Sequence, residues 1–127
     1  METTKNTPID ERFNVVSAIR DGNSATYEVL TNLEKDAHYV GHMFPDLILL
    51  DKVTKLPVFI IEVKKNGNIA QCIQQWKTVT SIPATLYIVV PELDLSNAKS
   101  IAEVVGLKTK FGSYKVSEAG KVIVKYE

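Results

Sequence analysis

Three ionisable residues occupy positions in this chain where apolar side chains would be expected. Asp46 opens the apolar segment 46–50 (DLILL), and Glu62 and Lys64 end the β-branched segment 57–64 (PVFIIEVK). Burying a carboxylate is costly unless a cation or several hydrogen bonds compensate its charge. Two carboxylates with an amine beside them could hold a divalent metal ion and a phosphate group.

The elements around these residues should bring them together. Segments 46–50 and 57–64 have the composition of β-strands, and the polar turn 51–55 predicts that they pair as an antiparallel hairpin. Side chains alternate along a strand, so Glu62 and Lys64 emerge on the same face. The start of the first strand lies beside the end of the second, which places Asp46 next to them.

The N-terminal third is less uniform in its pattern. A helix is expected over 8–20, because Phe13, Val16 and Ile19 recur at helical spacing and an Asp-Gly-Asn sequence follows. Residues 24–35 fit two patterns: one face of a helix, or the alternation of a strand. We prefer the helix there.

The rest of the chain predicts an α/β fold, a mixed central β-sheet flanked by helices. Strands are expected at 38–44, 85–90, 110–117 and 121–126, and helices at 69–81 and from Asp94 or Ser96 to Val105. The order strand, helix, strand in the middle implies a parallel crossover. The fully apolar segment 85–90 is typical of a central strand covered on both faces.

Pro45-Asp46 followed by Glu62-Val63-Lys64 resembles the PD-(D/E)xK motif of the restriction-endonuclease-like nuclease superfamily. The context agrees, because the first half begins a predicted strand, the second half ends one, and a helix and a core strand follow. The resemblance covers about residues 24–90. It implies a restriction-endonuclease-like core within one nuclease-like domain, residues 1–127.

The resemblance also implies roles for individual residues. Asp46 and Glu62, with the backbone carbonyl of Val63, would ligate Mg²⁺ or Mn²⁺. Lys64 would orient the attacking water or stabilise the transition state, although the same geometry would also give a structural ion pair.

Members of this superfamily commonly carry a further acidic residue upstream, on the first core helix. Glu28 is the candidate if 24–35 is helical, and Glu11 is the alternative if that segment is a strand. Several branches also place a glutamine on the helix after the lysine. Gln71 is preferred for that role, followed by Gln75, which lies one helical turn later on the same side.

The predicted function is a metal-dependent phosphodiesterase, an endonuclease or exonuclease acting on DNA or, with less support, on RNA. The basic segment 52–77, with five lysines against Glu62, could face phosphate groups. Such a small chain covers little duplex, so a homodimer or a larger nuclease complex is expected to supply affinity. The alternatives are a catalytically inactive module that binds nucleic acid or another protein, and a chance match in an unrelated interaction domain.

Composition excludes several other classes. The chain has 127 residues, of which 45% are hydrophobic and 24% charged, and this is typical of a globular domain. Its single cysteine, Cys72, excludes an internal disulfide framework and suits a reducing compartment. No apolar run approaches the roughly 18 residues that span a bilayer, so a soluble, cytoplasmic protein without membrane partners is expected.

Overall fold

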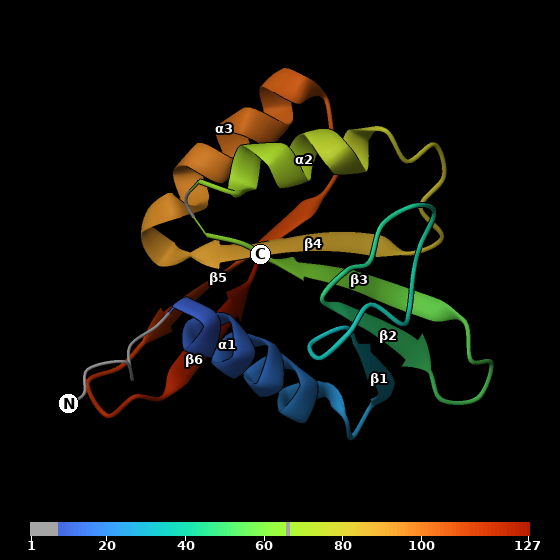
Figure 1. Ribbon diagram of the computed structural model, residues 1–127, viewed down its shortest axis with the longest axis horizontal. Coiled ribbons are helices and arrows are strands. Elements are labelled where there is room, and N and C mark those ends of the chain that lie inside the picture. Colours follow the sequence, from blue (N-terminus) through green and yellow to red (C-terminus); the bar gives the residue numbers. More distant parts are fainter. Residues whose placement is uncertain (1–7, 66) are drawn as a thin grey trace.

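A six-stranded mixed sheet forms the centre of the molecule (Figure 1). The computed structural model describes residues 8–65 and 67–127. The strands are β1 (Tyr27–Thr31), β2 (Leu47–Asp51), β3 (Pro57–Val63), β4 (Thr85–Pro91), β5 (Lys110–Val116) and β6 (Val122–Tyr126). The helices are α1 (Pro8–Asn23), α2 (Ile69–Lys77), the 3₁₀-helix η2 (Glu92–Asp94) and α3 (Leu95–Val105). The predicted α/β fold with a mixed sheet and flanking helices is confirmed.

The strands lie in the sheet in the order of the chain, β1 to β6. The first three pair antiparallel, β3, β4 and β5 pair parallel, and β6 returns antiparallel to β5. The two parallel connections run through α2 and α3, and the first of them, from β3 to β4, is the crossover predicted from the sequence. Gly106 adopts a left-handed conformation with φ 85° and ends α3, which glycine does at little steric cost.

The helices cover both faces of the sheet (Figure 1): α1 lies on one face, and α2 and α3 lie on the other. Alternation along β3 divides its side chains between two cores. Ile60 packs with α2 and α3, whereas Ile61 and Val63 pack with α1. Each core removes apolar surface from water, and this burial is the main stabilising contribution to the fold. In the described part of the chain, no helix has both the length and the apolarity needed to cross a bilayer.

The helix preferred over 24–35 is wrong. Residues 27–31 form β1, which pairs along its whole length with β2. Val29 packs into the core under α1 and Leu30 into the core under α2 and α3. These residues form a strand and not a helix, because pairing with β2 buries side chains on both faces of the sheet.

Three other element predictions need correction. The strand expected over 38–44 is absent from that segment, where a single bridge joins Val40 to Met43. α1 continues three residues beyond Arg20, and α2 ends at Lys77 instead of Ser81. Phe13 is exposed, because the buried stripe of α1 runs through Val15, Val16 and Ile19.

Candidate active site

The hairpin places Asp46 beside Glu62, as predicted. Leu47 pairs with Ile61, so the residue before β2 meets the end of β3. The backbone N–H of Asp46 donates a hydrogen bond to Glu62 Oε1 over 3.3 Å. Asp46 is 2% exposed and Glu62 is 3% exposed, so two acidic residues lie together in the interior. Such groups need compensating partners.

Glu62 lies on the α2 face of the sheet and has two compensating partners there. The indole Nε1 of Trp76, a fully buried side chain of α2, donates to Glu62 Oε2 over 2.8 Å. Lys64 Nζ lies 3.8 Å from Glu62 Oε1. Burial nevertheless raises the pKa of Glu62 from 4.5 to about 7, and the nearby Asp46 acts in the same direction, while Lys64 and Trp76 oppose the rise.

Asp46 is held from two sides. The backbone N–H of Val63 donates to Asp46 Oδ2 over 2.7 Å. The guanidinium of Arg12, on α1, donates to Asp46 Oδ1 through Nε at 3.0 Å and also through Nη2. Arg12 was not among the residues predicted from the sequence. Its position was a signal, because Arg12, Val15, Val16 and Ile19 follow helical spacing, so this arginine continues the buried stripe of α1.

An open groove of about 690 Å³ lies over Glu62 and Lys64. We call it the Glu62 groove; it is lined by His42, Met43, Phe44, Glu62, Lys64, Gln71, Gln74, Gln75 and Thr78. One wall is the loop between β1 and β2, and the other wall is α2 with the residue that follows it. The structure therefore brings Gln71 and Gln75 to the same groove as Glu62 and Lys64.

The loop wall of the groove is held by a buried amide. Asn32 Nδ2 donates to the carbonyls of His38 and Pro45, and Asn32 Oδ1 accepts from the backbone N–H groups of Ala37 and His38. The loop is tied to the α2 wall by a hydrogen bond of 3.0 Å between His42 Nε2 and Thr78 Oγ1. These contacts fix the position of the loop wall relative to α2.

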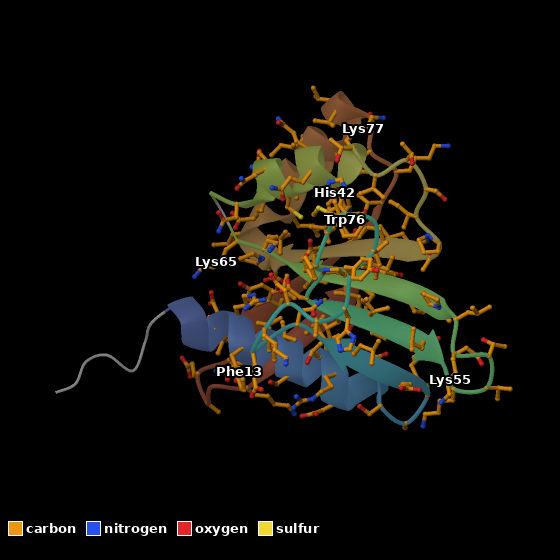
Figure 2. All side chains as sticks on the ribbon, turned by 45° about the vertical axis from the view of Figure 1, so that its right-hand side comes forward. Phe13, His42, Lys55, Lys65, Trp76 and Lys77 are labelled. Atoms are coloured by element: carbon orange, nitrogen blue, oxygen red, sulfur yellow. The ribbon has the colours of Figure 1, made fainter. Side chains whose placement is uncertain are left out.

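The two upstream acidic candidates lie at different places. Glu28, on β1, pairs with Lys55 at 2.8 Å, near the turn that joins β2 and β3. Glu11, on α1, pairs with Lys65 at 2.8 Å and accepts a hydrogen bond from Tyr114. In Figure 2, Lys55 and Lys65 lie at opposite ends of the molecule. Glu28 is thus away from Asp46, whereas Glu11 lies at the end of the sheet that carries Lys64.

The oxygen donors at this site have the chemistry that Mg²⁺ and Mn²⁺ prefer. Asp46 and Glu62 provide two neighbouring carboxylates, and each oxygen that accepts a single hydrogen bond keeps a second lone pair. Two features oppose metal binding. Asp46 Oδ1 already contacts Arg12. Within residues 8–65 and 67–127, no three or more His, Cys, Asp or Glu residues are arranged to hold a metal ion. The residues fit a divalent ion if Arg12 releases Asp46.

The comparisons with known proteins give one match. No family model and no curated protein matches the chain. Among solved structures, the chain is similar to one described as the structure of Pyrococcus furiosus SfsA in complex with Ca²⁺, at 9% sequence identity and a TM-score of 0.46. The alignment covers 93% of this chain and 62% of that one, so this chain spans less than two thirds of that protein's length. At this level of similarity, function has to be argued from the side chains of this chain.

Proposed function

We propose that this protein is a metal-dependent phosphodiesterase that hydrolyses nucleic acid, with DNA a better substrate than RNA. The supporting observation is that buried Asp46 and Glu62 lie side by side, and that Glu62 and Lys64 line an open groove. Buried carboxylates that gain nothing from their position destabilise a fold, so their presence next to a lysine in a groove favours a functional role. The PD-(D/E)xK-like spacing of the same residues supports phosphodiester chemistry and DNA as the substrate.

In this proposal Asp46 and Glu62, with the carbonyl of Val63, would hold Mg²⁺ or Mn²⁺. When bound, such an ion lowers the pKa of a bound water and neutralises charge on the scissile phosphate. Asp46 keeps its hydrogen bond from the backbone of Val63, which fixes the orientation of the carboxylate. Its other oxygen has to exchange the contact with Arg12 for the ion.

Lys64 would act on the phosphate. Its ammonium group lies at 3.8 Å from Glu62 Oε1, which is longer than a hydrogen bond, and its side chain is partly exposed to the groove. A cation in this position can stabilise the negative charge that develops on the phosphate oxygens, or orient the attacking water. Gln71 and Gln75 could contact the substrate from the α2 wall. Glu11 is the better placed of the two upstream acids. A homodimer or larger complex, and a cytoplasmic location, stay predictions from the sequence.

A second function is favoured by the contact between Arg12 and Asp46. The guanidinium neutralises the carboxylate that a metal would need. The chain would then be a catalytically inactive module that binds nucleic acid through the same groove. A measurement of metal binding distinguishes the two functions, because the phosphodiesterase requires the ion and the inactive module does not.

A cleavage assay tests the proposal. Wild type, Asp46→Asn and Glu62→Gln are incubated with single-stranded, duplex and branched DNA in Mg²⁺, in Mn²⁺ and in chelator. We expect cleavage by wild type that requires the metal and is lost in both variants. Lys55→Ala is the matched control, because this lysine also pairs with a glutamate but lies at the far end of the sheet. Cleavage that persists in chelator, or equally in Asp46→Asn, would reject the assigned site.

A further inference from the structure

We propose that the Glu62 groove binds a single strand of nucleic acid with unstacked bases, and not an intact duplex. This inference rests on the proposed function, because it takes nucleic acid as the substrate. Three features of the groove support it: an exposed aromatic pair on its loop wall, amide side chains on its α2 wall, and a low number of cationic groups.

The aromatic pair consists of Tyr39 and Phe44. Their ring centroids lie 6.1 Å apart with an interplanar angle of 61°, and both side chains are exposed. Phe44 lines the groove and Tyr39 extends the aromatic surface beyond it. Exposed aromatic rings stack well on the face of a base, and such stacking is largely independent of sequence. In a duplex, both faces of each base are covered by neighbouring base pairs, so this surface would have no partner there.

The opposite wall presents Gln71, Gln74 and Gln75, which are all exposed on α2. Each amide offers two donors and an acceptor, the combination that the hydrogen-bonding edge of a base requires. In a single strand these edges are free, whereas in a duplex the Watson–Crick edges are occupied. A base held between Phe44 and the glutamines would leave its phosphate near Lys64 on the groove floor.

The low positive charge of the groove also favours a single strand over a duplex. Among the described residues that line it, Lys64 is the one lysine or arginine, and Glu62 offsets its charge. Duplex binding depends mainly on several phosphate contacts made by lysine and arginine and therefore weakens steeply with salt. A groove with a single lysine gains little from that source, so stacking and hydrogen bonding to free bases must supply its affinity.

The test measures binding separately from cleavage. Fluorescence anisotropy of a labelled 12-nucleotide single-stranded DNA and of the corresponding duplex is recorded in chelator, at two salt concentrations. We expect the single strand to bind at least tenfold more tightly, with a shallow dependence on salt. Phe44→Ala should weaken single-strand binding by about thirtyfold, the middle of the range for loss of one stacked base. Gln71→Ala should weaken it by a smaller factor.

Phe13→Ala is the matched control. Phe13 is 49% exposed and Phe44 is 43% exposed, but Phe13 lies on α1, away from His42 (Figure 2), and does not line the groove. It should leave binding unchanged, and thermal unfolding should confirm that both variants are folded. Equal or tighter binding of duplex, equal losses in the two phenylalanine variants, or no binding would overturn the inference. Single-strand binding without cleavage would instead reject the phosphodiesterase, and metal-dependent cleavage with tighter duplex binding would keep it and reject the inference.

Discussion

Each end of the β2–β3 hairpin places a lysine beside a glutamate, in opposite settings, and the glutamate at the turn end, Glu28, comes from β1. At the turn, Lys55 and Glu28 form an ion pair of 2.8 Å on the surface. At the other end, Lys64 lies 3.8 Å from Glu62, which is buried and has a raised pKa. Solvent screens the shorter pair, so it contributes at most about 1 kcal/mol. The burial of the glutamate, and not the distance between the two charges, therefore identifies the end of the hairpin at which we propose catalysis.

Lys64→Ala should have the largest effect. If Lys64 acts on charge that develops in the transition state, the cleavage rate should fall by about 10²- to 10³-fold with the fold intact. Lys55→Ala should leave the rate unchanged. Rates and thermal midpoints are measured on the same preparations. A loss of stability in Lys64→Ala with an unchanged rate would make Lys64 a structural partner of Glu62.

Glu62 should make stability depend on pH. Its folded pKa of about 7 lies above the ordinary value of 4.5, so between these values the folded state binds more protons than the unfolded state. The free energy of unfolding should therefore fall as pH rises from 5 to 8, by up to roughly 3 kcal/mol. Glu62→Gln, which can still accept the hydrogen bond from Trp76, should flatten this dependence. Urea unfolding at several pH values without metal is the measurement, and an identical slope in the variant would contradict it.

Replacing Arg12 should strengthen metal binding, whereas replacing Asp46 should abolish it. Mg²⁺ at ten times its Kd should stabilise wild type by about 1.4 kcal/mol, and Asp46→Asn should abolish this gain. Arg12→Gln should lower the Kd by about tenfold, because a hydrogen-bonded charge no longer competes for Asp46. Arg20→Gln is the control, since its side chain is 41% exposed against 42% for Arg12. Calorimetric titration decides, and an unchanged Kd in Arg12→Gln would mean that the ion binds elsewhere.

Glu28→Ala should have the smallest effect. The variant loses the surface ion pair with Lys55, so its stability should change by less than about 1 kcal/mol and its cleavage rate should stay at the wild-type value. A rate loss comparable to that of Lys64→Ala would restore Glu28 as a site residue. Glu11→Gln, measured alongside, tests the acid that lies nearer the site.

The hairpin and its three charged residues could be predicted because strand alternation and a short polar turn determine register locally. Arg12 could not be assigned in the same way. Its spacing places it on the buried face of α1, but its partner is 34 positions away and becomes a neighbour only when the helix packs on the sheet. β1 was missed for a related reason, because its pairing with β2 decides between two patterns that residues 27–31 fit equally well.

Asn32 would be easily mistaken for a catalytic residue in a library of variants screened for activity. It is buried, and its amide satisfies four backbone groups of one loop with two donors and one accepting oxygen. Aspartate has the same shape but would set a carboxylate oxygen against two carbonyls. A single deamidation there, which adds less than one dalton in mass, would therefore release the loop wall while every side chain that lines the Glu62 groove remained in place.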